Sequence, residues 1–158
     1  MSFATERRYS NCVGVLIAAG ADPNEKDKLG QRPLHFTAKN GDAGCLGILL
    51  KAGADIRKED IGGKTAYKYA LELKYVECMK EMLKHYLALA IKEGNVELVK
   101  KLIFLGKYFI SSDEFVLLAI EVGNKEIMQV IVDFYKEKTL EIPVKFMIKL
   151  REFGINIY

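Results

Sequence analysis

Few side chains in this sequence could carry bond-making chemistry. The chain has two histidines, His35 and His85, and three cysteines, Cys12, Cys45 and Cys78. A nucleophilic site needs a Cys or Ser, a His and a carboxylate that converge in one cleft, and no motif here implies one. Zinc sites usually need paired ligands at short spacing, and each cysteine stands alone. We therefore predict no catalytic residue, no cofactor and no metal site.

A glycine pair also invites comparison with a phosphate-binding loop. Gly62-Gly63 is followed by Lys64-Thr65, as at the end of that motif. The motif needs another glycine five residues before Gly63, where this chain has Lys58. The spacing fails, so we interpret the pair as the tip of a loop.

The elements that carry these residues recur at a fixed interval. Successive cysteines are 33 residues apart, and Gly30 and Gly63 share that interval. Residues 12–22 also read much like residues 45–55. A fixed period of this length indicates stacked helical repeats, each of which buries its apolar strip against a neighbour.

One unit of the repeat is complete, over residues 27–59. Pro33 stands where a first helix should begin, because the first helical turn needs no backbone donor there. Gly41 should end that helix, and Gly53 should end the second one in the left-handed conformation. The second helix has an apolar stripe of α-helical period, formed by Cys45, Leu46, Leu49 and Leu50.

This pattern resembles the ankyrin repeat family. The matching residues are Asp27, Gly30, Pro33, Leu34, His35, Ala38, Gly41, Leu49, Leu50, Gly53, Ala54 and Asp55. The family's Thr-Pro-Leu-His motif stands here as Arg32-Pro33-Leu34-His35, and the match is close over residues 12–83 and weaker to about residue 134. The resemblance implies an all-α solenoid of stacked antiparallel helix pairs with short β-hairpin fingers.

We expect a single domain over residues 1–158. The predicted repeats are 1–26, 27–59, 60–83, 84–110 and 111–136, with a C-terminal cap helix in 137–158. The chain begins inside a first helix, either because it is cut from a longer array or because that helix is a cap. About 13 residues are missing from the fourth unit, so Lys84-His85-Tyr86 should join two helices where a finger would stand.

The last predicted helix opens at Pro143. We place Val144, Met147, Ile148 and Leu150 on its apolar side. We interpret it as a half-repeat cap, and a sixth, degenerate repeat is the alternative.

Several polar side chains have expected structural roles. The resemblance implies that the His35 ring ties neighbouring turns together by hydrogen bonds. His85 should lie at the surface or at a helix start, and the three cysteines should form a buried ladder. Asn24, with Leu16 and Asp22, has a spacing similar to that of finger asparagines that are hydroxylated in some ankyrin proteins. The simpler interpretation is that Asn24 makes the turn.

The composition of the chain narrows the classes of partner and the cellular compartments that we expect. Lys and Arg number 24 and Asp and Glu 21, a net charge of +3 that is too balanced to indicate nucleic acid. Lone cysteines at a helical position indicate a reducing compartment. The start of the chain lacks the apolar region of a signal peptide, and no apolar run is long enough to span a membrane. We expect a cytoplasmic or nuclear monomer that binds neither nucleic acid nor membrane.

The family's fingers and first helices form one concave surface, which the resemblance implies for this chain. Carried over residue by residue, that surface comprises Lys26, Lys28, Leu29, Gln31, Lys39, Glu59, Ile61, Lys64, Glu72, Lys92 and Glu93, followed by Glu121 and Val122. Leu29 and Ile61 are apolar finger-tip residues with lysines nearby, which favours a partner with acidic and apolar groups.

Three functions are compatible with these observations. The first is a non-catalytic module that binds a partner protein along the concave face. The second is a regulatory or targeting segment of a larger enzyme, or of a viral or pathogen effector that acts on a host. The third is nucleic-acid binding, which rests on the lysine-rich fingers and would fall steeply with salt.

Overall fold

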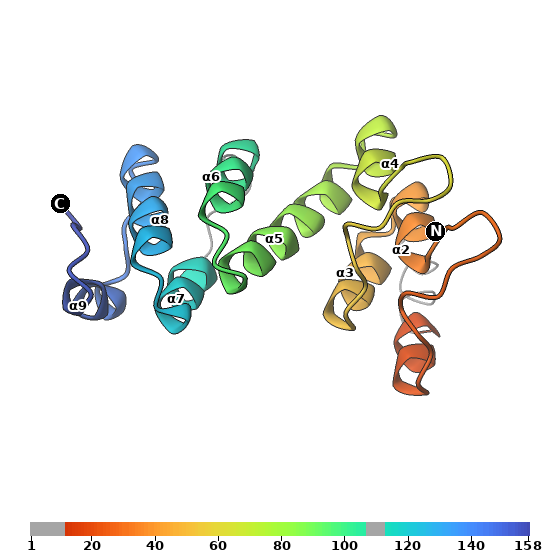
Figure 1. Cartoon of the computed structure of the whole chain (residues 1–158), viewed down its shortest axis with the longest axis horizontal. Coiled ribbons are helices and arrows are strands. Elements are labelled where there is room, and N and C mark those ends of the chain that lie inside the picture. Colours follow the sequence, from red (N-terminus) through yellow and green to blue (C-terminus); the bar gives the residue numbers. More distant parts are fainter. Residues whose placement is uncertain (1–11, 107–112) are drawn as a thin grey trace, which may run out of the picture. The chain divides into compact units, whose positions relative to one another are not determined.

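A computed structural model describes residues 12–106 and 113–158, which divide into an N-terminal unit, Met1–Met82, and a C-terminal unit, Leu83–Tyr158. The described residues are mostly helical, as predicted (Figure 1). Residues 12–18 are helical. The helices that follow are α2 (Pro33–Asn40), α3 (Ala43–Lys51), α4 (Ala66–Glu72), α5 (Val76–Lys92), α6 (Val96–Leu105), α7 (Asp113–Val122), α8 (Lys125–Glu137) and α9 (Val144–Glu152). The predicted first helix of the first repeat lies outside the described residues.

The complete repeat has the boundaries that its sequence predicts. α2 begins at Pro33 and is followed by Gly41, whose φ of 70° is left-handed. Tyr75 packs so closely on Gly41 that a Cβ there would lie 2.8 Å from its ring. One repeat later Lys74 takes the place of Gly41 and adopts the same left-handed conformation, with φ of 60°. The turn is therefore preserved where its glycine is not.

The core of the N-terminal unit lies where α2 packs against α3 and α4. Leu34 and Ala38 of α2 are buried there, together with Ala66 and Ala70 of α4. Small residues at these positions let the first helices of successive repeats approach closely. The predicted apolar stripe of α3, from Cys45 to Leu50, is also buried.

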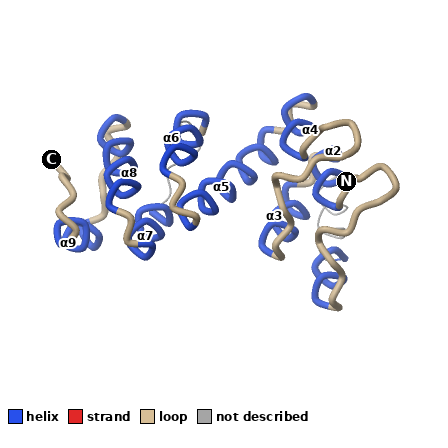
Figure 2. The backbone as a smooth tube through the Cα atoms, in the orientation of Figure 1, coloured by secondary structure: helices blue, strands red, loops and turns tan. Residues whose placement is uncertain are grey.

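The fingers differ from the β-hairpins that we expected. Among the described residues the loops contain no regular strand, and only an isolated bridge joins Glu59 and Thr65 (Figure 2). In each finger an aspartate carboxylate accepts hydrogen bonds from backbone N–H groups two and four residues later. Asp27 does so in the first finger and Asp60 in the second. The side chain thus satisfies donors that a strand ladder would otherwise use.

The predicted connector at Lys84-His85-Tyr86 is wrong. α5 is one unbroken helix of 17 residues, and the boundary between the two units falls within it. No glycine or proline interrupts it. Its buried residues continue at helical spacing through the expected break, at Cys78, Met82, Leu83, Leu87, Ala90 and Ile91. The second helix of one repeat and the first helix of the next have therefore merged.

The C-terminal unit consists of further capped helices. Asn95 and Asn124 cap α6 and α8 by accepting backbone N–H hydrogen bonds. α8 packs against α6 and α7, and α7 packs against α9. The segment after α9 is held to α8, because the Gln129 amide bonds both backbone groups of Asn156. None of the described helices is long and apolar enough to cross a membrane.

The apolar side of the last helix needs correction. Pro143 does precede α9, as predicted. Leu150 is buried, but its partner in the core is Phe146, while Val144 and Ile148 are exposed and Met147 is half-buried. Phe146 and Leu150 lie one helical turn apart on the face that meets the unit, which leaves the other apolar side chains uncovered.

Candidate functional site

His35 has the structural role that the resemblance implies. Its ring is buried, and Nδ1 accepts a hydrogen bond of 3.1 Å from the backbone N–H of Arg32. Nε2 must then carry the proton, which it donates over 3.1 Å to the carbonyl oxygen of Lys64 in the next finger. The ring therefore links two successive repeats, and both of its nitrogens are engaged in hydrogen bonds.

A further hydrogen bond, within the third repeat, joins Asp60 to Tyr69. The Tyr69 hydroxyl donates to the Asp60 carboxylate over 2.5 Å, while Gly62 and Lys64 donate backbone N–H groups to its other oxygen. The Tyr69 hydrogen bond, with these N–H groups, lowers the pKa of Asp60 to about 2. The same bond raises the pKa of Tyr69. The edge-on ring of His35 lies 6.2 Å from the Tyr69 ring, centroid to centroid, so the tyrosine is held from two sides.

Four of the predicted binding residues gather around the Tyr69 ring. The Nζ atoms of Lys39 and Lys64 lie 4.4 Å and 5.2 Å from its centroid, within cation–π range. Lys39 donates to the Gln31 side-chain oxygen over 2.9 Å, and Lys64 forms an ion pair of 2.7 Å with Glu72. The structure thus brings Gln31, Lys39, Lys64 and Glu72 together.

The finger tips also meet. The backbone N–H of Ile61 donates to the carbonyl oxygen of Leu29 over 3.1 Å. Gly30 is needed for this approach, because its φ is 69° and a Cβ would lie 3.2 Å from the Ile61 nitrogen. The Leu29 and Ile61 side chains are nevertheless 52% and 75% exposed. The predicted neighbours Lys26, Lys28 and Glu59 are exposed as well.

Two aromatic residues of this surface were missed by the sequence analysis. Phe36 is exposed on α2, with the Nζ of Lys39 at 5.8 Å from its centroid. Tyr69 occupies the equivalent place on α4, one period later. The signal was present, since aromatic residues 33 positions apart recur on the exposed side of both first helices.

The remaining predicted residues belong to the C-terminal unit. Lys92 and Glu121 line a shallow hollow of about 230 Å³ between α5 and α7, together with Leu117. Glu93 and Val122 are exposed beside it but do not line it. Because α5 is one continuous helix, no finger separates its N-terminal and C-terminal halves.

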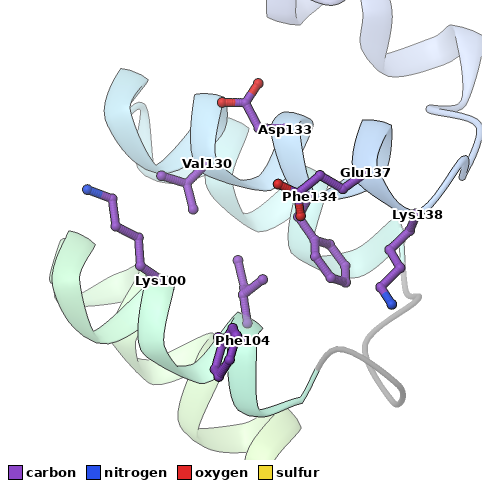
Figure 3. Close-up of a pocket in the computed structure, with 8 residues that line it drawn as sticks. Lys100, Phe104, Val130, Asp133, Phe134, Glu137 and Lys138 are labelled. Atoms are coloured by element: carbon purple, nitrogen blue, oxygen red, sulfur yellow. The ribbon is translucent and has the colours of Figure 1, made fainter.

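A larger groove of about 480 Å³ lies between α6 and α8, and the sequence did not predict it (Figure 3). Its apolar lining includes Phe104, which is 72% exposed. Figure 3 shows Phe104 facing Phe134 across the groove, with Lys100 at one end and Lys138 at the other. A phenylalanine on the charged side of α6, next to Lys100 and Lys101, was the available signal.

The described cysteines and acidic residues differ in burial and form no cluster of metal ligands. No group of three or more His, Cys, Asp or Glu residues there could hold a metal ion. Burial raises the pKa of Cys78 to about 11, which keeps it a thiol. The predicted cysteine ladder holds for Cys45 and Cys78, but Cys12 is exposed.

Asn24 does more than form its turn. Its amide donates to the Gly53 carbonyl oxygen over 3.0 Å and accepts from the backbone N–H of Asp55 over 2.8 Å. These two bonds fasten one finger to the end of α3 in the next repeat.

Comparison with known proteins adds one finding to this geometry. Residues 1–88, more than half of the chain, match a family model described as ankyrin repeats in three copies. No curated protein matches the chain.

Proposed function

This chain belongs to the ankyrin repeat family, whose members are generally protein–protein interaction modules, and from that premise we propose that it is a non-catalytic module that binds a partner protein. The proposed binding surface runs along the finger tips and first helices of the N-terminal unit. Lys92, which lines the hollow of the C-terminal unit, and Glu93 beside it form a separate part of the proposal within that unit.

One observation carries the proposal. Leu29 and Ile61 stand side by side, joined through the backbone, yet both side chains are exposed to solvent. Apolar side chains fixed in neighbouring positions lose little conformational freedom when a partner covers them, so more of the burial energy remains as affinity. Lys26 and Lys28 beside them favour a partner that carries acidic groups.

The rigidity of the fingers supports the same function. Asp27 and Asp60 hold the loops by their carboxylates. Asn24 fastens its finger to the following repeat, and His35 fastens the second finger to the preceding repeat. A surface that keeps its shape without a partner can bind with little rearrangement. The regulatory or targeting role in a larger protein, as the alternative, would use this same surface. We keep the cytoplasm or nucleus as the proposed location.

The test is a double substitution at the first finger tip, Lys28→Glu with Leu29→Ala. Partner proteins retained by the immobilised wild-type chain should no longer be retained by this variant, because both the apolar anchor and the charge are lost. Removal of a central apolar anchor alone costs about 2 kcal/mol or more in a typical interface. Mass spectrometry of the retained proteins gives the readout, and circular dichroism checks the fold.

A matched control makes the same change outside the proposed surface. Lys101 and Leu105 are exposed on α6, and Lys101→Glu with Leu105→Ala should leave the retained proteins unchanged. The proposal fails if the finger-tip variant keeps every partner of the wild type.

A further inference from the structure

Two successive repeats contain the same arrangement with different charge. In each, a finger residue bonds the side chain eight positions later on the first helix. The third repeat uses Lys64 and Glu72, an ion pair that is neutral overall. The second repeat uses Gln31 and Lys39 at the equivalent positions, 33 residues earlier. The Lys39 ammonium group therefore occupies the place where the next repeat has a carboxylate.

Lys39 lies over aromatic rings but has no counter-ion among the described residues. It is half-buried, and its hydrogen-bond partner is the neutral amide oxygen of Gln31. In the part of the chain that the structure describes, no carboxylate lies within ion-pair distance of it. An ammonium group has three donors, so two remain for an external acceptor. A partly desolvated cation of this kind gains more from a carboxylate than a fully exposed one does.

The surroundings of Lys39 are fixed and apolar on one side. The Tyr69 ring beneath it is held by Asp60 and His35, and the exposed Phe36 ring lies next to it. A ligand group that reached the Nζ of Lys39 would also cover Phe36. This arrangement suits a carboxylate that has an apolar neighbour.

We infer that Lys39, with Tyr69 and Phe36, forms a subsite for an Asp or Glu side chain of the partner protein, flanked by an apolar residue. The inference rests on the proposed function and adds the chemistry of the partner at one place on the surface. Glu72 is an internal competitor for Lys64 and not for Lys39, because it forms an ion pair with Lys64, the other cation over the same ring.

A peptide carboxylate fits this subsite better than a nucleic-acid backbone does. A row of phosphates needs several uncompensated cations in line. Here Lys64 is already paired with Glu72, and Glu59 is exposed on the same finger. These acidic groups would repel successive phosphates but leave room for one carboxylate.

The experiment selects random peptides displayed on phage against the immobilised chain and then measures a synthetic consensus peptide by fluorescence anisotropy. The selected peptides should be enriched in Asp or Glu next to an apolar residue. Lys39→Met keeps the aliphatic stem and should weaken binding roughly tenfold, as expected for a lost charged hydrogen bond. Lys68→Met, at an exposed position on α4 outside the cluster, should change nothing.

A gain-of-binding variant separates this role from a merely structural one. Glu72→Gln removes the internal competitor and should strengthen binding by roughly two- to fivefold, the range of an exposed ion pair. Selected peptides that lack acidic residues, or an affinity that Lys39→Met does not alter, would overturn the subsite while leaving the proposed function intact. Failure to select any peptide would count against both. Binding of an oligothymidine that depends on Lys39 would overturn the assignment to a peptide.

Discussion

Asp60 joins several parts of the N-terminal unit through one carboxylate. One oxygen closes the finger by accepting two backbone N–H groups, and the other holds the Tyr69 hydroxyl on α4. Asp27 closes the first finger in the same way. The sequence predicted these loops, because Asp27 and Asp60 recur at the repeat period. It could not predict the tyrosine, since that bond depends on how α4 is oriented toward its own finger.

The pH dependence of stability should report on this carboxylate. The folded-state pKa of Asp60, about 2, lies below its ordinary value of 3.8. The ionised group therefore stabilises the fold above about pH 4, and that contribution is lost as the pH falls through about 2. Asp60→Asn should lower the urea midpoint at pH 7, and its difference from the wild type should shrink between pH 4 and pH 2.

The exposed Asp133 provides the control for this titration. Asp133→Asn should leave the free energy of unfolding in urea within a few tenths of a kcal/mol of the wild type at pH 7. A deficit of Asp60→Asn that stayed constant down to pH 2 would contradict the assigned role.

At the scale of elements, local signals predicted some helices well and failed for others. Pro33 and Gly41 bound α2 as expected, because both act through their own backbone conformation. The continuity of α5 could not be predicted by comparison with the repeat. The residues missing from the fourth unit suggested a short connector, but the chain continues there as a helix. The buried face of α9 was misassigned because its five apolar residues offer two alternative stripes, and only packing selects Phe146 and Leu150.

The continuity of α5 can be tested with proline. Lys84 lies inside the helix, where proline removes a backbone hydrogen bond and clashes with the preceding turn, at a cost of about 3 kcal/mol or more. Lys84→Pro should therefore lower the free energy of unfolding in urea by at least that amount. Lys84→Ala measures the loss of the side chain alone and should cost under about 1 kcal/mol. Equal stability of the two variants would indicate a connector at this position.

At the scale of the whole molecule, the repeat period predicted the solenoid class but not the boundary between the two units. The 33-residue interval was clear through Cys78 and lost after it. The boundary between the units falls just beyond, within α5. The groove between α6 and α8 was not predictable, because it depends on the separation of two helices and not on a motif. The finger surface was predictable, since equivalent positions repeat along the chain.

A repeat array is stabilised mainly by neighbouring layers, so a core defect should act locally. Leu46 in the N-terminal unit and Ile131 in the C-terminal unit are both buried. Leu46→Ala and Ile131→Ala should each cost about 2 to 5 kcal/mol. Hydrogen exchange measured by mass spectrometry should show reduced protection mainly in the unit that carries the substitution. Equal loss of protection in both units would show that they unfold as one.

The hydrogen bond between Leu29 and Ile61 also fixes a spacing that a partner must match. The N–H of Ile61 and the carbonyl oxygen of Leu29 lie 3.1 Å apart, so neither tip can shift without breaking this bond. A partner must therefore present an apolar surface broad enough to cover both exposed side chains at once. A substitution that displaced either finger would disturb both anchors together.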